Sequence, residues 1–181
     1  MKIVAFDLAT VVGCASGAPT GKPRLWTVDL GKRLSDGQRF ARVHRMTAAI
    51  IATERPDRIV IEGAVGGPRS SMFLVGMIAV VKAAAWERRV HVEEYNIGAI
   101  RSHFIGGNIT SASKQFRHLS ESKRKGAARA QAKASVIGRC VSLGWAPQND
   151  NEADAAALWD FACSRVSRSH QITTMGGLFN G

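Results

Sequence analysis

The run Lys2-Ile3-Val4-Ala5-Phe6-Asp7-Leu8 decides the fold, because it is typical of a buried β-strand and yet carries a carboxylate. A charged side chain in such a strand is costly unless something compensates it. Two more acids have similar settings: Glu62 ends the run Ile59-Val60-Ile61, and Asp154 opens the helical stretch 153–159. Clustered acids that stay ionised at neutral pH need a cation, and Mg²⁺ or Mn²⁺ suits oxygen ligands. The sequence therefore predicts a divalent metal site.

The size and composition of the chain predict one domain, spanning residues 1–181. A chain of 181 residues that is 45% hydrophobic can build one substantial core. The longest uncharged apolar run, Phe73 to Val81, is too short to cross a bilayer, and the N-terminus lacks a signal pattern. We therefore expect a cytoplasmic protein with no membrane partner. The three cysteines form no CxxC pair, which argues against a disulfide framework or a structural zinc site.

Positive charge is concentrated in one segment. The chain has 25 Lys and Arg against 14 Asp and Glu, a net charge of +11, and the stretch 101–139 holds nine basic residues against one acid. Such a concentration is expected of a polyanion-binding surface, because each neutralised phosphate releases counterions. The alternative is a solvated basic loop that binds nothing. Beside an acidic metal site, phosphodiester binding is the favoured interpretation.

The order of hydrophobic runs and turn residues indicates an α/β fold with a mixed five-stranded sheet flanked by helices. We expect strands at 2–8, 12–16, 25–30, 58–62 and 90–95, and helices at 35–55, 71–86, 97–104, 127–143 and from 150 to about 166. The first three strands form a meander, and strand 58–62 lies parallel to the first because a helix connects them. Residues 106–126 are predicted to form a mobile basic loop, and the tail 167–181 has little pattern.

The predicted helix 71–86 has little polar surface, since only Lys82 interrupts its apolar residues. A helix that is apolar on nearly all sides needs cover on both, from its own sheet and from something else. A second subunit is one candidate for that cover, which predicts a homodimer through this helix. A helix buried wholly within one chain is the alternative.

The predicted topology brings the acids together at one edge of the sheet. Asp7 lies on the first strand, Glu62 at the C-terminal end of its parallel neighbour, and Asp154 at the start of a helix packed over the same edge. Asp150 and Asn151 precede Asp154 by four and three residues and share its helical face. Two ions about 3.5–4 Å apart, held by such acids, would clamp a phosphodiester. Each acid alone has a structural alternative: a hydrogen-bonded strand residue, a surface residue, or a helix-dipole acid.

Several motifs resemble those of the RuvC-type Holliday-junction resolvases, especially their phage-borne relatives. They are Phe6-Asp7-Leu8-Ala9-Thr10, Ile59-Val60-Ile61-Glu62, the segment 70–76 and Asn151-Glu152-Ala153-Asp154-Ala155, and the resemblance spans residues 1 to about 166. It implies an RNase H-like fold, a homodimer, dependence on Mg²⁺ or Mn²⁺, and paired nicks in four-way DNA. By resemblance, Asp7, Glu62 and Asp154 match the family's acidic metal ligands.

The chain departs from the family at two positions. The family carries an acid or a histidine where this chain has Asn151, so either Asp150 completes the metal shell or the second ion binds less tightly. Lys133 falls where the family has a catalytic lysine. Arg101 stands at a second family lysine, and because arginine cannot donate its proton, the expected role of Arg101 is electrostatic.

The predicted function is that of a divalent-metal-dependent, structure-selective endonuclease that resolves branched DNA by paired nicks. Two alternatives stay open: a non-catalytic junction-binding protein with a degraded metal site, and an RNase H-like nuclease for another branched or hybrid substrate. The residues expected to contact DNA are Arg69, Phe73, Arg101, Lys114, Lys123, Arg124, Lys125, Arg129 and Lys133.

Overall fold

A five-stranded mixed sheet forms the centre of the computed structural model, which describes residues 1–64, 71–106, 116–167 and 170. The strands are β1 (Ile3–Asp7), β2 (Val11–Gly17), β3 (Arg24–Asp29), β4 (Arg58–Glu62) and β5 (His91–Tyr95). Their order across the sheet is β3-β2-β1-β4-β5. The first three strands are antiparallel and β4 and β5 run parallel to β1, which confirms the predicted meander and the predicted parallel pairing.

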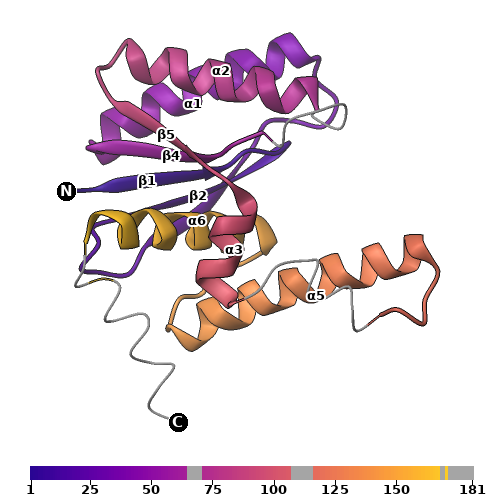
Figure 1. Cartoon of the computed structure of the whole chain (residues 1–181). Helices are drawn as coiled ribbons and strands as arrows, with labels where there is room; N and C mark the ends of the chain where they lie inside the picture. The colour runs from indigo at the N-terminus through magenta and orange to yellow at the C-terminus, as the bar shows by residue number, and fades with distance from the viewer. Residues whose placement is uncertain (65–70, 107–115, 168–169, 171–181) are drawn as a thin grey trace.

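Helices cover both faces of the sheet (Figure 1). They are α1 (Asp36–Glu54), α2 (Met72–Trp86), α3 (Ile97–Ile105), α5 (Glu121–Ser142) and α6 (Asp150–Val166). Helices α1 and α2 lie on one face, and α6 lies on the other, with α3 and α5 packed beside it. Five strands between two helical layers confirm the predicted α/β class.

Each face of the sheet has its own hydrophobic core. Val4 and Phe6 of β1 belong to the cluster with α1 and α2, whereas Ile3 and Ala5 belong to the cluster with α6. This alternation follows from the two-residue period of a strand. Because both faces are covered, the apolar residues of β1 and β4 form nearly continuous runs, as in other buried parallel pairs.

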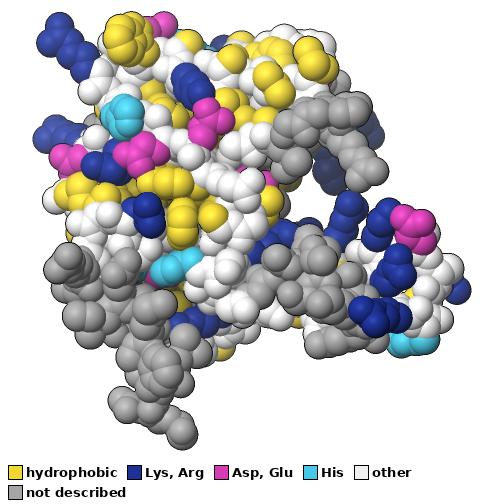
Figure 2. Space-filling view, in the orientation of Figure 1, with side chains coloured by type: hydrophobic (Ala, Val, Ile, Leu, Met, Phe, Trp, Pro, Cys, Tyr) yellow, Lys and Arg dark blue, Asp and Glu magenta, His cyan; other side chains and the backbone are white. Residues whose placement is uncertain are grey.

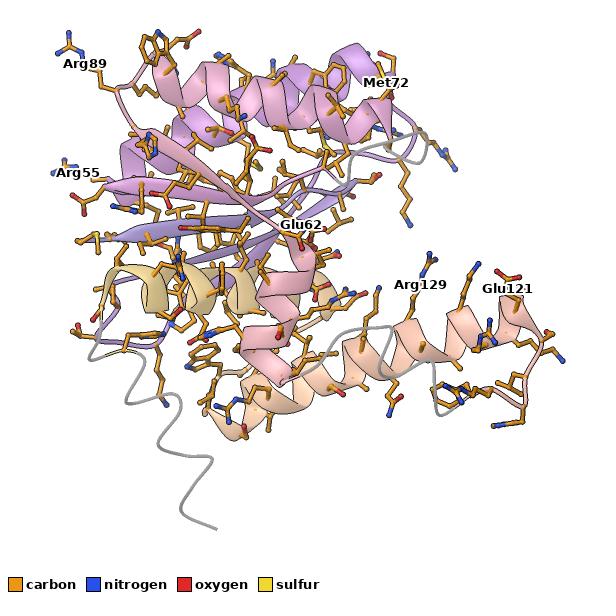
Figure 3. The ribbon with its side chains drawn as sticks, viewed as in Figure 1. Arg55, Glu62, Met72, Arg89, Glu121 and Arg129 are labelled. Atoms are coloured by element: carbon orange, nitrogen blue, oxygen red, sulfur yellow. The ribbon has the colours of Figure 1, made fainter. Side chains whose placement is uncertain are left out.

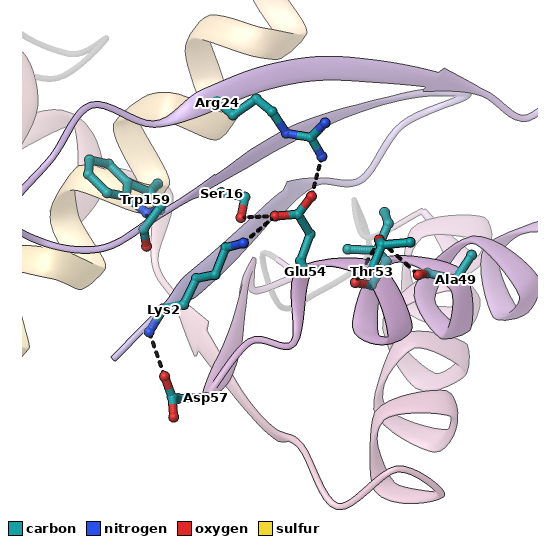
Figure 4. A network of polar contacts seen from close by, with 10 residues as sticks. Lys2, Ser16, Arg24, Ala49, Thr53, Glu54, Asp57 and Trp159 are labelled. Carbon is teal, nitrogen blue, oxygen red and sulfur yellow. Dashed lines mark hydrogen bonds and ion pairs between the residues drawn. The ribbon is translucent and has the colours of Figure 1, made fainter.

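The connection from the meander to β4 is fixed at both ends of α1. The Ser35 Oγ accepts the backbone N–H of Gln38 at 3.3 Å and the Gln38 side chain accepts the Ser35 N–H at 3.0 Å, a capping box. At the other end, the Glu54 carboxylate binds Lys2 at 2.6 Å, Ser16 at 2.8 Å and Arg24 (Figure 4). These contacts tie the end of α1 to the first three strands.

The boundary of α5 corrects the sequence prediction. The stretch 121–126 was assigned to a mobile loop, but α5 begins at Glu121, six residues before the predicted start. Glu, Lys and Arg are good helix formers, and an ion pair between Glu121 and Lys125, four residues apart, supports the first turn. Residues 107–115 of the predicted loop and most of the tail 167–181 lie outside the described residues.

No helix in the described part of the chain is long and apolar enough to span a membrane. All three cysteines are buried free thiols.

Candidate active site

The first two acids lie at the same edge of the sheet because β1 and β4 are parallel and in register. Phe6 of β1 is opposite Ile61 of β4, so the next residue of each strand, Asp7 and Glu62, falls at the carboxyl end of the pair. Figure 3 shows Glu62 at this edge, where the chain from β5 enters α3. The carboxyl ends of parallel strands are the usual location of functional groups in such sheets.

The third acid arrives on α6, which rests directly on the backbone of β2. Gly13 pairs with Asp7 across the antiparallel ladder. A Cβ atom at Gly13 would lie 1.9 Å from the backbone oxygen of Asn151, so only glycine permits this approach. The start of α6 is fixed by Asn149, whose side chain accepts the N–H of Glu152 at 3.0 Å. Asp154 follows within the first two turns, over the edge that carries Asp7.

Asp7, Glu62 and Asp154 line one small pocket together with Arg101 of α3. Its remaining walls are apolar or backbone: Ile97, Ile100, Val136, Ala157 and Leu158. The pocket has a volume of about 10 Å³, which is room for roughly one water-sized group. The structure thus brings the three predicted ligands to one place from three separate elements.

The electrostatics of the pocket are unfavourable to its own carboxylates. Burial, together with the smaller effect of the charges on Asp154, Glu62 and Asp150, raises the pKa of Asp7 from 3.8 to about 8. Burial also raises the pKa values of Glu62 and Asp154, which Arg101 partly opposes. Several acids that raise one another's pKa are characteristic of functional sites.

The donor set fits a hard divalent cation, although the side chains do not converge on a single point. Within the residues that the structure describes, no three Asp, Glu, His or Cys side chains are arranged to hold an ion together. Like charges without a cation between them favour separation. Carboxylate oxygens are the ligands that Mg²⁺ and Mn²⁺ prefer, and the raised pKa of Asp7 reports burial and repulsion, whose cost such an ion would offset.

Asp150, which was predicted to complete the metal shell, forms an ion pair with Lys133 of α5. The Lys133 ammonium lowers the pKa of Asp150, and the same hydrogen bond raises the pKa of Lys133. Asn151 is not among the residues that line the pocket, and its backbone oxygen faces β2. Metal binding by these two residues therefore stays a prediction, while Lys133 lies close enough to act on the charges of Asp154 and Asp7.

The predicted DNA-binding residues lie mostly on a helix that protrudes from the body. The C-terminal half of α5 packs on α6 and α3, and its N-terminal half extends away from the sheet (Figure 1). Lys123, Arg124, Lys125 and Arg129 occupy this protruding half. Dark-blue side chains gather along it in Figure 2, and Figure 3 shows Arg129 directed toward the side that carries Glu62. Arg69 and Lys114 lie outside the described residues.

Phe73 packs within the protein rather than standing free. Its ring stacks on Phe40 of α1 with centroids 5.4 Å apart, and the Arg39 guanidinium lies 5.4 Å from the same ring. Gly76, one turn later, allows α1 this close, because a Cβ there would lie 2.4 Å from the Phe40 ring. A DNA contact by Phe73 stays a prediction.

A pair of histidines bound to one buried carboxylate escaped the sequence interpretation, which gave no role to any histidine. Asp160 of α6 is 2% exposed and binds His103 at 2.9 Å and His170 at 2.7 Å. Burial alone would raise the pKa of Asp160, but the two histidine hydrogen bonds more than reverse this and lower it. The pKa of His170 is raised, since Asp160 and the Pro19 carbonyl outweigh its burial. The signal was a charged residue within the apolar stretch 155–163.

Comparison with known proteins supports this fold. Neither the protein-family models nor the curated proteins contain a match to this chain. Among solved structures, RuvC of Thermus thermophilus matches with 18% identity and a TM-score of 0.61, covering 98% of this chain and 96% of that chain. Thermus thermophilus RuvC in complex with a Holliday junction substrate matches with 17% identity and a TM-score of 0.60, covering 99% and 96%. The chain therefore has the RNase H-like fold of RuvC over nearly its full length, as its motifs predict.

Proposed function

We propose that this protein is a divalent-metal-dependent endonuclease that nicks four-way DNA junctions. The observation that carries this proposal is the pocket in which Asp7, Glu62 and Asp154 repel one another, at the strand edge of a RuvC fold. A structural core gains nothing from three desolvated carboxylates, whereas a metal site requires them. The likeness to a RuvC structure that contains a Holliday junction substrate supports branched DNA as the substrate.

The residues have distinct roles in this proposal. Asp7, Glu62 and Asp154 would hold Mg²⁺ or Mn²⁺, which supplies Lewis-acid activation of the phosphodiester and of the attacking water. Lys133, kept charged by its ion pair with Asp150, places an ammonium beside the same acids and would attract the scissile phosphate. A pair of ions in each site, as predicted from the sequence, stays a prediction.

The basic half of α5 would hold the arms of the DNA. A protruding helix that carries Lys123, Arg124 and Arg129 offers phosphate contacts at a distance from the acidic pocket. Phosphate contacts give affinity without sequence preference, and each one lost reduces the salt dependence of binding. Binding to a four-way junction should therefore weaken steeply with salt.

Helix α2 would join two copies of the chain. One face of α2 is exposed along its whole length and mainly apolar: Met72, Val75, Ala79, Ala83 and Trp86. Met72 is 82% exposed and Trp86 is 83% exposed, so the alternative of a helix buried within one chain is wrong. A groove of about 870 Å³ beside Trp86 continues this face past Val90 and Val92. Paired nicks need two active sites, which a second copy supplies.

A cleavage panel tests the proposed function. Four-way, three-way, flap, duplex and RNA–DNA hybrid substrates are incubated with Mg²⁺ or Mn²⁺ and the wild-type protein, Asp7→Asn or Glu62→Gln. We expect metal-dependent nicking of the four-way junction, lost in both variants while junction binding persists. An Asp36→Asn variant is the control, since that carboxylate is exposed in the first turn of α1. Undiminished cleavage by both variants would refute the site, and tight junction binding without any metal response would favour the non-catalytic alternative.

A further inference from the structure

We propose that the guanidinium of Arg101 takes the place of one of two cations in the acidic pocket, so that each copy of the chain binds one divalent ion. This inference rests on the proposed function, because it concerns the same pocket. It assigns Arg101 a role inside the metal site, beyond the contact with DNA that the sequence predicts.

The fold fixes Arg101 at the pocket. Helix α3 follows β5 after one residue, Asn96, whose side chain accepts the N–H of Gly98 at 2.8 Å and caps the helix. Arg101 lies one turn further on, and its side chain lines the pocket together with Glu62 and Asp154. Because β5 is the parallel neighbour of β4, this helix start necessarily lies at the edge where the acids gather.

The guanidinium is held near the acids without being committed to one of them. Among the residues that the structure describes, the buried Arg101 Nε has no hydrogen-bond partner. In the described part of the chain, no hydrogen bond or ion pair joins Arg101 to Glu62 or Asp154, although its charge acts on both. A buried donor without a partner is costly, so its position requires compensation. The field of the surrounding carboxylates supplies that compensation, as it would for a metal ion.

Space and charge in the pocket both fit one ion better than two. Its volume of about 10 Å³ matches roughly one water-sized group. Three carboxylates and one guanidinium line the pocket, so two negative charges are left after the guanidinium is counted, and a single divalent ion neutralises them. Asp150, the nearest additional acid, is already paired with Lys133. A second ion would face excess positive charge and only the neutral amide of Asn151 as a new ligand.

Arginine suits this role better than lysine. Among these acids a lysine at position 101 would also be charged near neutral pH, but only a guanidinium remains charged at any pH that the protein tolerates. A permanent cation therefore excludes a second ion under all such conditions.

The test measures Mn²⁺ binding and thermal unfolding without DNA, on the whole chain, for the wild type, Arg101→Gln, Arg101→Lys and the control Arg45→Gln. Arg45 is an exposed arginine of α1. Titration calorimetry should give one ion per chain for the wild type, Arg101→Lys and the control. Arg101→Gln should bind a second ion, or bind its first about tenfold more tightly, because a nearby positive charge is gone. In chelator, Arg101→Gln should also melt below the control.

Two ions of similar affinity in the wild type would overturn the inference and leave the proposed function standing. An Arg101→Gln variant that is folded, with unchanged stoichiometry, affinity and melting temperature, would likewise overturn it. Absence of Mn²⁺ binding to the wild type would refute the proposed function itself, and the inference with it. Arg101→Lys guards against misfolding, because it keeps the charge and should keep a stoichiometry of one.

Discussion

Replacing Asp7 by Asn should stabilise the metal-free protein while abolishing nicking. The folded state raises the pKa of Asp7 from 3.8 to about 8, mainly by burial. In the folded protein this carboxyl group holds its proton up to a higher pH than in the unfolded chain. The folded state is therefore progressively destabilised as pH rises from about 4 to about 8. Between the ordinary Asp7 pKa of 3.8 and pH 7, this effect lowers the free energy of unfolding by about 4 kcal/mol in total, and the neutral amide should restore that amount.

The assay is thermal unfolding in chelator at pH 5 and pH 7.5. For a chain of this length, about 4 kcal/mol corresponds to roughly 8–16 °C in melting temperature. We expect Asp7→Asn to melt well above the wild type at pH 7.5, and the gap to narrow at pH 5. Saturating Mn²⁺ should raise the melting temperature of the wild type far more than that of the variant.

The control for this measurement is Asp36→Asn, which removes an exposed carboxylate paired with Arg39. It should lower stability by about 1 kcal/mol or less at both pH values. If Asp7→Asn is no more stable than the wild type in chelator at pH 7.5, burial and repulsion do not destabilise the Asp7 carboxylate and the argument for a metal site fails.

Three further predictions concern the scaffold. Asp160→Asn should cost about 3 kcal/mol, because the amide keeps only one of the two oxygens that bind His103 and His170 and loses the negative charge beside them. Folding lowers the pKa of Asp160, so its carboxylate stabilises the protein above its ordinary pKa of about 4; folding raises the pKa of His170, so its imidazolium stabilises the protein below its ordinary pKa of about 6.5. The loss of stability should therefore be greatest between about pH 4 and pH 6.5. A loss that is independent of pH in denaturant titrations would contradict this. Gly13→Ala should displace α6, lower stability by about 2 kcal/mol or more, and reduce nicking activity. A variant that melts and cleaves like the wild type would show that the contact between α6 and β2 is not rigid. Trp86→Asp should give the monomer mass by light scattering at micromolar concentration, whereas Val141→Asp, at an exposed apolar site on α5, should not; equal masses for wild type and Trp86→Asp would remove α2 from the interface.

The sheet was predictable because its strands carry strong local signals. β4 was predicted with its observed bounds, since a short β-branched run between Pro56 and a loop leaves little choice. The capping box of Ser35 and Gln38 fixed the start of α1 in the same way. The acids were found for a related reason, because a carboxylate in an apolar strand needs a partner. That reasoning identified which residues meet but not how closely, and the three side chains share a pocket without converging.

The remaining features depend on contacts that local sequence does not encode. The stretch 121–126 is polar and contains a glycine, so it resembles a loop, and helix α5 extends through it as a continuation of a packed segment. The position of Arg101 among the acids follows from the order of strands across the sheet, which was not predicted in full. The pairing of His103 with His170 through Asp160 joins residues far apart in the chain, and no local spacing indicates it.

The acids of the proposed metal site come from β1, β4 and α6, so their sequence positions lie far apart. A chain in which α6 has not docked on the sheet lacks Asp154 at the edge where Asp7 and Glu62 lie. Because α6 also covers one whole face of the sheet, such a chain exposes that apolar face as well. The same docking of α6 therefore closes one core and completes the pocket, so the three acids of the proposed metal site cannot assemble before that face of the sheet is covered.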